Sequence, residues 1–419
     1  MNKTNNPKAK SWVEIPKNSD FPIQNLPYGI FDAGKGARAG VAIGNHILDL
    51  AEVAQLGSFD EIGINKAVFE QKTLNDFIAL GKKVWTATRE QIFSLLSEGN
   101  QEIQPNKATV LVEMAKAKML MPVQVGDYTD FYSSIEHATN VGIMFRGKDN
   151  ALMPNWRHIP VGYHGRASSI VVSGTDIHRP KGQTMPPEAE KPIFGASKRM
   201  DFELEMAFIV GKETKLGDNI STKEAEDHIF GFTVFNDWSA RDIQKWEYVP
   251  LGPFLGKNFG SSSSPWIVTL DALEPFRVES PKQEPEVLDY LKCDGKHNFD
   301  IQLEVDLTPE NGEKTTISKS NFKYMYWNIC QQLAHHTVNG CNVNVGDMLA
   351  SGTISGKTED SYGSMLELSW AGKKDIPLKD GSTRKFIADN DTIAMRGFCE
   401  KDGLRIGFGK VEGKILPAK

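Results

Sequence analysis

The fold is decided by the stretch Asp201-Phe202-Glu203-Leu204-Glu205-Met206-Ala207-Phe208-Ile209-Val210. Large apolar side chains occupy every second position, which is the period of a β-strand. Glu203 and Glu205 alternate with them and would stand side by side on the opposite face. Such a pair suits one bound cation, because carboxylate oxygens reach Ca²⁺ at about 2.3–2.6 Å. The stretch alone also allows a second interpretation, in which both carboxylates line a solvent-facing strand edge.

Length and composition indicate an ordinary soluble protein of two domains. The 419 residues exceed what a single core usually serves, and 40% are hydrophobic and 24% charged. A net charge of −6 argues against nucleic acid and anionic membranes as obligatory partners. No apolar run reaches the roughly 18 residues of a membrane-spanning helix, and the polar start has no apolar signal core. We therefore expect a cytoplasmic location.

The four cysteines show no spacing typical of a metal site. They are Cys293, Cys330, Cys341 and Cys399, without a CxxC pair. A thiol in the cytoplasm is usually a small buried apolar group, so we interpret all four as reduced and structural. Any bound metal is therefore expected to use oxygen ligands.

Short apolar runs cut by Gly and Pro predict a small β-barrel in the first part of the chain. Residues 38–50 are typical of a hairpin that turns at Gly44-Asn45. Between Thr73 and Gly99, apolar residues three, four or seven apart predict a helix that Gly81 divides in two. No chemical motif precedes about residue 120. We expect a supporting domain over residues 1–120 and a catalytic domain over residues 121–419.

Polar groups of varied chemistry gather after Gly126. Residues 127–140 combine acids, tyrosines and a histidine, as functional loops do. A buried strand at residues 229–235 leads to Asp237, a third candidate metal ligand. The loop at residues 252–260 carries a lysine but lacks the Walker order, so phosphate binding is a weak interpretation.

The carboxy-terminal third supplies another candidate carboxylate. Residues 320–338 predict a helix, whose adjacent His335 and His336 would diverge and serve a structural or surface role. Glu367 lies among apolar neighbours in residues 363–370. A carboxylate there needs a partner, which a catalytic histidine would supply.

Five blocks of the chain together resemble the fumarylacetoacetate hydrolase family. The blocks are residues 130–134, 137–142, 202–205, 236–242 and 363–370. With the long amino-terminal region, the resemblance extends over nearly the whole chain. That region and the block from Asp130 to Asn140 are its most specific parts. The resemblance implies a mainly β fold with some α, in which an amino-terminal SH3-like barrel precedes a catalytic β-roll of mixed strands. It also implies a homodimer.

The resemblance further implies two cation sites. Ca²⁺ or Mg²⁺ would occupy the catalytic site, and the implied ligands are Asp130, Glu203, Glu205 and Asp237. A second, structural cation, Mg²⁺, would be held by groups matching Asp237, Lys257 and Ser261. The family more often has Thr at the last position, and Ser261 keeps the hydroxyl.

The reaction implied by the resemblance is hydrolysis of a carbon-carbon bond in 4-fumarylacetoacetate, which gives fumarate and acetoacetate at the end of tyrosine and homogentisate catabolism. A 1,3-diketone offers two oxygens to a hard cation, which suits an all-oxygen site. His137 is the candidate general base, oriented by Glu367. The candidates for binding the oxyanion are Arg241, Gln244 and Lys257. The candidates for binding the substrate are Tyr132, Arg146, Tyr163, Gln244, Tyr248 and Thr353.

Other functions compete with this one. Acylpyruvate hydrolysis, oxaloacetate decarboxylation or diketone isomerisation would use the same scaffold, but such relatives tend to lack the amino-terminal barrel. A calcium-stabilised β-scaffold that binds a partner without catalysis would lack the base, whereas His137 and Glu367 are both present. A serine hydrolase is disfavoured because the chain has no GxSxG elbow.

Overall fold

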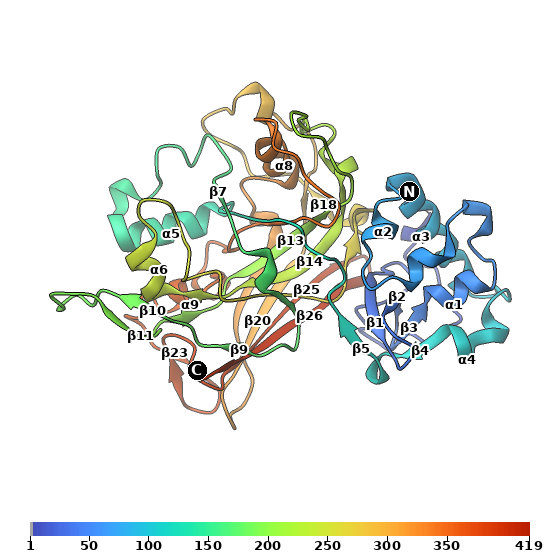
Figure 1. Ribbon diagram of the computed structural model, residues 1–419, viewed down its shortest axis with the longest axis horizontal. Helices are drawn as coiled ribbons and strands as arrows, with labels where there is room; N and C mark the ends of the chain where they lie inside the picture. The colour runs from blue at the N-terminus through green and yellow to red at the C-terminus, as the bar shows by residue number, and fades with distance from the viewer. Residues whose placement is uncertain (1–2) are drawn as a thin grey trace.

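The computed structural model describes residues 3–419 as two β-rich parts that lie side by side (Figure 1). The amino-terminal part is a five-stranded antiparallel half-barrel with the strand order β4-β3-β2-β1-β5. Its strands are β1 (Tyr28–Asp32), β2 (Arg38–Ile43), β3 (His46–Asp49), β4 (Leu111–Glu113) and β5 (Lys118–Leu120). Its α-helices are α1 (Leu50–Gln55), α2 (Asn75–Ile78), α3 (Lys82–Leu96) and α4 (Lys107–Val110).

Two glycines set the chain direction in this part as the sequence predicts. Gly44 has φ of +55° in the turn between β2 and β3. Gly81 has φ of +88° and separates α2 from α3. Both backbone conformations favour glycine because they strain a residue with a Cβ atom. The predicted hairpin and the predicted break in the helix are confirmed.

The described carboxy-terminal part contains two large mixed sheets and four antiparallel pairs of short strands. The larger has the order β7-β6-β22-β13-β14-β16-β8, and β17 also pairs with β14. Its strands are β6 (Tyr128–Phe131), β7 (Gly162–His164), β8 (Ile170–Val172), β13 (Leu204–Val210), β14 (Ile229–Asp237), β16 (Ser261–Ser263), β17 (Val268–Thr269) and β22 (Met348–Ala350). The other, ordered β21-β20-β25-β26-β9, contains β9 (Ile177–His178), β20 (Gln302–Thr308), β21 (Thr315–Asn321), β25 (Thr392–Lys401) and β26 (Leu404–Leu416). The predicted fold class is confirmed.

Strand β13 is buried on both of its faces. Leu204, Met206 and Phe208 enter the core of the carboxy-terminal part. Ala207 and Ile209, on the opposite face, join a core that is shared with the amino-terminal part. Glu205 is 0% exposed and Glu203, just before the strand, is 5% exposed. The interpretation of a solvent-facing strand edge is therefore wrong.

The helix predicted over residues 320–338 is only partly correct. Helix α8 is limited to Ile329–Thr337. The first two residues of the predicted helix, Ser320 and Asn321, instead form the end of β21, which pairs with β20. Asn328 begins the helix by a capping box with Gln331. None of the helices between residues 3 and 419 is long and apolar enough to cross a bilayer.

Aromatic side chains join the two parts. The ring of Phe230, on β14, lies 5.1 Å from that of Trp85, 5.7 Å from that of Tyr28 and 6.2 Å from that of Phe77, measured between centroids. All four side chains are buried. The amino-terminal part thus covers the back of the sheet whose strand ends carry the candidate site.

This shared core predicts a large loss of stability for Phe230→Ala. Removing the ring leaves a cavity among three aromatic neighbours, so we expect the free energy of unfolding to fall by about 3–5 kcal/mol. Urea unfolding monitored by tryptophan fluorescence and far-ultraviolet circular dichroism measures it. Leu216→Ala, at a side chain 83% exposed, is the control and should change stability by less than about 0.5 kcal/mol. A loss below about 1 kcal/mol for Phe230→Ala would contradict the shared core.

Candidate active site

The predicted metal ligands meet at one end of the larger sheet. Strand β6 runs parallel to β22, which is antiparallel to β13, and β13 is antiparallel to β14. The ends of β6 and β14 therefore lie beside the start of β13. This topology brings together Asp130, Glu203, Glu205 and Asp237, all buried. Candidate ligand oxygens of the first three lie within 4.8 Å of one another.

Two cationic side chains balance part of this charge. The Lys257 ammonium bonds Glu203 Oε2 and lies 2.7 Å from Asp237 Oδ2. Arg241 Nη1 lies 2.6 Å from Glu203 Oε1, and its Nε donates to Asp201 at 2.8 Å. Burial alone would raise the pKa of Glu203, but Lys257 and Arg241 lower it below the usual range. Glu203 is therefore ionised.

The remaining carboxyls fit a bound cation. Asp130 Oδ1 and Glu205 Oε1 are buried, and no residue from 3 to 419 offers either atom a hydrogen bond. Burial raises the pKa of both groups, and the carboxylates around them raise it further. Unpartnered hard oxygens in an acidic cluster are the ligands that Ca²⁺ and Mg²⁺ prefer. The donor set therefore suits such an ion.

Asp237 is surrounded by groups predicted for the second cation. Ser261 Oγ donates to its Oδ1 at 2.7 Å, and Lys257 contacts its Oδ2. Tyr163 OH also donates to that Oδ2, at 2.8 Å. The structure brings these residues together, and the Lys257 ammonium already supplies positive charge at Asp237. The assignment of Mg²⁺ to this position stays a prediction.

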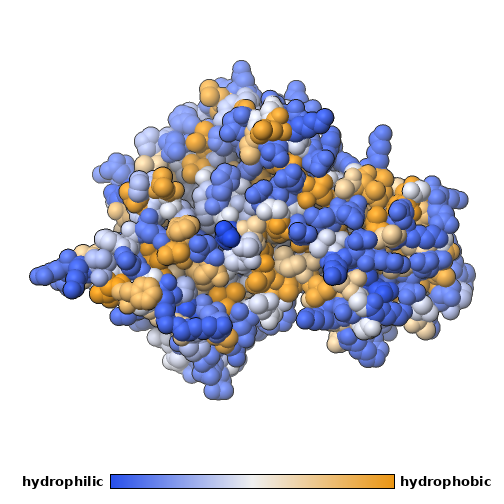
Figure 2. Space-filling model, viewed as in Figure 1, coloured by the Kyte–Doolittle hydropathy of each residue, from blue (hydrophilic) through white to orange (hydrophobic). Residues whose placement is uncertain are grey.

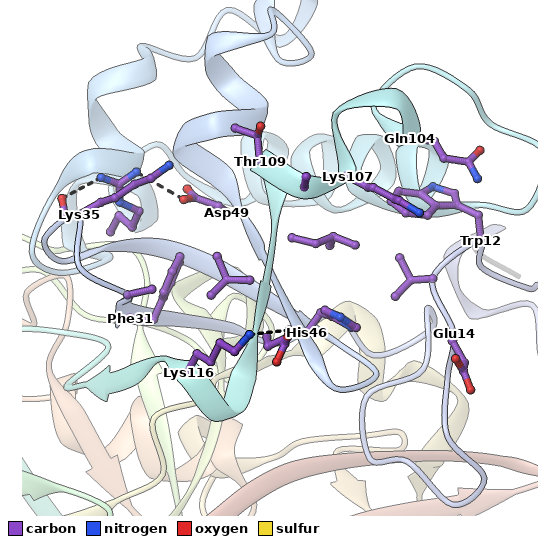
Figure 3. A pocket seen from close by; sticks show the side chains of 17 residues that line it. Trp12, Glu14, Phe31, Lys35, His46, Asp49, Gln104, Lys107, Thr109 and Lys116 are labelled. Carbon is purple, nitrogen blue, oxygen red and sulfur yellow. Dashed lines mark hydrogen bonds and ion pairs between the residues drawn. The ribbon is translucent and has the colours of Figure 1, made fainter.

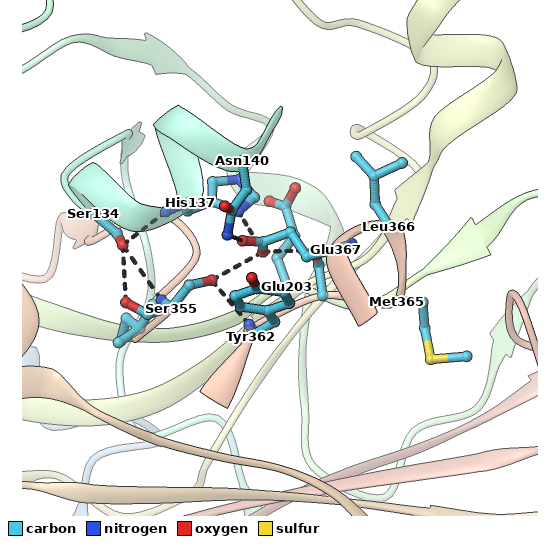
Figure 4. A network of polar contacts seen from close by, with 12 residues as sticks. Ser134, His137, Asn140, Glu203, Ser355, Tyr362, Met365, Leu366 and Glu367 are labelled. Atoms are coloured by element: carbon cyan, nitrogen blue, oxygen red, sulfur yellow. Dashed lines mark hydrogen bonds and ion pairs between the residues drawn. The ribbon is translucent and has the colours of Figure 1, made fainter. Parts of the chain in front are cut away.

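A buried histidine and glutamate, His137 and Glu367, lie near Glu203 (Figure 4). His137 is near the start of α5 (Ile135–Arg146), which Ser134 caps. Its Nδ1 lies 2.6 Å from Oε2 of Glu367 in α9 (Met365–Leu368). Burial would raise the pKa of Glu367, but His137 and the neighbouring donors lower it. Since Nδ1 donates to this carboxylate, Nε2 is the nitrogen that can accept a proton.

Sequence reasoning missed three further residues that hold Glu367. Asn140 Nδ2 donates to Oε1 at 2.9 Å, and the hydroxyls of Ser355 and Ser364 each donate to Oε2 at 2.9 Å. Asn140 lies three residues after His137, a helical spacing that could have indicated it. No sequence signal marks Ser355, because only the fold brings its loop to the glutamate. The carboxylate has donors enough to remain charged in a buried position.

One group predicted to bind the oxyanion, Arg241, and one predicted to bind the substrate, Thr353, each have an atom free to form a further hydrogen bond within residues 3–419. Arg241 Nη2 and Thr353 Oγ1 are buried and have no hydrogen-bond partner within the described chain, residues 3–419. Gln244 Oε1 accepts from Arg241 Nη1 at 3.4 Å, and the ring of Tyr132 lies edge-on against His137 at 5.2 Å. Because Arg241 also contacts Glu203, its free nitrogen lies beside the carboxylate cluster.

Arg146 and Tyr248 are not part of this buried cluster. Arg146, at the end of α5, is exposed and donates to the carbonyls of Asn150 and Ala151 at 3.1 and 2.7 Å. Tyr248, which follows α6 (Arg241–Glu247), is 48% exposed. A role of either residue toward a substrate stays a prediction.

Cavities flank the sheet and the half-barrel. One of about 410 Å³ is lined by Tyr163, Asp237, Lys257 and Ser261 and so opens onto the candidate site. A larger one of about 660 Å³ lies in the amino-terminal part, where Trp12, His46 and Lys107 line it (Figure 3). None of the predicted site residues lines the larger cavity.

Comparisons with known proteins agree with this geometry. The model of the family described as fumarylacetoacetate hydrolase C-terminal matches residues 128–416, and that described as fumarylacetoacetase N-terminal matches residues 24–122. A fumarylacetoacetase of Caenorhabditis elegans is 56% identical over 98% of this chain and 99% of its own length. One of Homo sapiens is 54% identical over 97% and 99%.

Solved structures support the fold alone. A fumarylacetoacetate hydrolase of Exiguobacterium antarcticum has a TM-score of 0.54 and 18% identity, and the match covers 94% of this chain and all of that chain. The two family models together span both parts of the structure, and the identity to the curated relatives extends over nearly the full length. This chain belongs to the fumarylacetoacetase family.

Proposed function

We propose that this protein is a cytoplasmic fumarylacetoacetase, which hydrolyses 4-fumarylacetoacetate to fumarate and acetoacetate in tyrosine catabolism. The observation that carries the proposal is the buried His137–Glu367 pair beside a cluster of carboxylates with unpartnered oxygens. A base next to a set of hard ligands suits the hydrolysis of a diketone. Relatives named for this activity share more than half of their residues with this chain.

The proposed catalytic cation is Ca²⁺ or Mg²⁺. Its ligands would be Asp130, Glu203, Glu205 and Asp237. A second, structural Mg²⁺ would be held by Asp237, Lys257 and Ser261, and Lys257 would contribute its backbone carbonyl because its ammonium is charged. When bound, the catalytic cation supplies Lewis acidity toward the two oxygens of a diketone.

His137 performs the first proton transfer in this proposal. Its Nε2 removes a proton from the water that attacks the substrate carbonyl, while Nδ1 keeps its hydrogen bond to Glu367. The charged Glu367 stabilises the imidazolium that forms. Hydrogen bonds from Asn140, Ser355 and Ser364 hold the Glu367 carboxylate in its orientation. The pair thus acts without a nucleophilic serine.

Cationic and hydroxyl donors bind the developing negative charge. Arg241 Nη2 and Thr353 Oγ1 have no partner among residues 3–419, so both would be available to donate to substrate oxygens, and Gln244 lies beside the guanidinium. Burial lowers the pKa of Lys257, but Asp237 and Glu203 raise it, so the ammonium stays charged and can return a proton to the departing carbon. The other groups proposed to bind the diketo acid are Tyr132, Arg146, Tyr163 and Tyr248.

We also propose a homodimer formed through an exposed apolar surface, the hairpin patch. It combines β10 (Lys181–Thr184) and β11 (Ile193–Ala196) with residues 246–255. Its exposed apolar residues are Ile193, Phe194, Trp246, Tyr248, Val249, Leu251, Phe254 and Leu255. The hairpin projects at the left of Figure 1, and apolar residues gather at its base in Figure 2. An exposed patch of this kind is typical of a protein interface.

Replacing the proposed base tests the function directly. For His137→Ala we expect kcat on 4-fumarylacetoacetate to fall by about 10²–10⁴-fold with little change in circular dichroism. Loss of substrate absorbance measures the rate. His158→Ala, at an exposed histidine, is the control and should retain full activity. Unchanged activity of His137→Ala would rule out this base, and turnover of an acylpyruvate or oxaloacetate instead would mean a different substrate.

The raised pKa values of Asp130 and Glu205 predict that cation binding releases protons. In the metal-free protein these carboxyls retain protons above their usual titration range, and Ca²⁺ must displace them. Carboxyls with a raised pKa stabilise the metal-free fold at low pH, and this contribution is lost as the pH rises through their raised values. The increase in Tm on adding Ca²⁺ should therefore be larger in alkaline than in mildly acidic buffer.

Calorimetric titration of chelator-treated protein with Ca²⁺ measures the effect. The observed enthalpy should depend on the ionisation heat of the buffer, and Asp130→Asn should weaken the binding and the proton release together. A binding enthalpy that is the same in every buffer would contradict this coupling.

The hairpin patch predicts an association that depends on apolar contact. Leu251 is 97% exposed, so Leu251→Asp should leave the fold intact and shift a dimer toward monomer. Sedimentation velocity measures the distribution. Leu216→Asp, at an exposed leucine outside the patch, should remain dimeric. A monomeric wild-type protein at micromolar concentration would refute the proposed dimer.

A further inference from the structure

A second group of metal-binding side chains lies outside the carboxylate cluster. Cys293 and His297 belong to the segment before β19 (Asn298–Phe299), and Cys330 belongs to α8. One ligand atom from each of the three lies within 4.8 Å of the others. Cys330 is buried, and the other two are half-buried. The group therefore has both the ligand atoms and the burial that are typical of a metal site.

The distances suit a tetrahedral ion. Cys330 Sγ lies 3.5 Å from His297 Nδ1. Two ligands of zinc at about 2.3 Å for sulfur and 2.05 Å for nitrogen would be about 3.6 Å apart in a tetrahedron. Glu226 adds a carboxylate, whose Oε1 lies 3.9 Å from Cys330 Sγ and 2.8 Å from His297 Nδ1. The second contact is a hydrogen bond, which the ion would replace and widen to about 3.4 Å, the separation of two such ligands in a tetrahedron. A fourth ligand is thus within reach.

Surrounding groups orient these donors toward a common point. His297 Nε2 contacts the carbonyl of Asp294 at 3.0 Å, which leaves Nδ1 facing the thiols. Arg277 holds Glu226 with two bonds of 2.8 Å, one to each oxygen. Histidine and carboxylate ligands of metals are commonly fixed by such outer hydrogen bonds.

We propose that Cys293, His297, Cys330 and Glu226 bind one Zn²⁺ ion in a structural site. Two thiols and an imidazole are the donors that zinc prefers, and four protein ligands leave no position open for a substrate. Binding displaces the two thiol protons and the proton that lies between His297 and Glu226. The charges of two thiolates, one carboxylate and Zn²⁺ sum to −1, opposite the Arg277 guanidinium. The expectation that all metal ligands are oxygens would then be incomplete.

The ion would brace the helix that supports the catalytic segment. It would tie α8, through Cys330, to the segment that carries Cys293. Two residues further along α8, Gln332 Nε2 donates to Ser133 Oγ at 2.9 Å. Ser133 precedes the residue that caps α5, the helix of His137. Bound Zn²⁺ should therefore raise the Tm of the whole protein.

Metal titration of the full chain tests the site. Reduced, chelator-treated protein is saturated with Ca²⁺, to occupy the oxygen cluster, and is then titrated with Zn²⁺ or with Co²⁺ as a spectroscopic probe. We expect one equivalent to bind, and Co²⁺ to give the charge-transfer and visible bands of a tetrahedral thiolate complex. Cys293→Ala and Cys330→Ser should each lower Zn²⁺ affinity by on the order of 100-fold or more.

Two matched variants locate the ion. Cys341→Ser, at a half-buried thiol that contacts the carbonyl of Asn342, should keep the stoichiometry and the cobalt spectrum. Asp130→Asn, in the other cluster, should also keep that spectrum. Cys293 is on a half-buried segment, so its alanine variant should fold, which circular dichroism checks before titration.

Three results would overturn the proposal. One is the absence of Zn²⁺ binding at micromolar concentration by the reduced wild-type protein. Another is an unchanged cobalt thiolate spectrum in Cys293→Ala. The last is a Cys293–Cys330 disulfide, mapped by mass spectrometry, in protein that takes up no zinc when reduced, since the pair would then be a redox couple.

Discussion

Most of the structure follows from the burial of four carboxylates at one end of a single sheet. Taking charges out of water costs several kcal/mol for each ion unless opposite charge is close by. Lys257 and Arg241 supply that charge to Glu203 and Asp237, whereas Asp130 and Glu205 keep oxygens that no described side chain satisfies. The imbalance within residues 3–419 leaves a buried set of carboxylate oxygens that could hold a metal ion.

The same constraint explains why β13 is covered on both faces. The face with Leu204, Met206 and Phe208 packs in the carboxy-terminal core. On the face that carries Glu205, Ala207 and Ile209 pack in the core shared with the half-barrel. An exposed sheet would admit water to the carboxylates and weaken every electrostatic interaction there. The amino-terminal part thus supports the chemistry without contributing a predicted catalytic residue.

Some elements could be predicted from the sequence and others could not. Alternation in residues 201–210 predicted β13, and the glycines at 44 and 81 predicted a turn and a helix break, because period and backbone freedom are local properties. The helix predicted over residues 320–338 was partly wrong, since pairing with β20 extends β21 to Asn321 and overrides local preference. The resemblance indicated His137 and Glu367, and the fold places His137 Nδ1 2.6 Å from Glu367 Oε2. Their partner Ser355 left no comparable signal.

The sequence by itself determined the class of the fold, the family and the identity of the candidate carboxylates, because these depend on local period and on motifs read along the chain. Tertiary structure alone decided which charges are balanced and which oxygens are left without partners, since the pairing of β6, β13 and β14 sets those distances. It also brought Cys330 to His297, which lies 33 residues earlier. Ligand spacing along a chain is informative only where the ligands share one element, and here the packing of a helix against a distant segment assembled them.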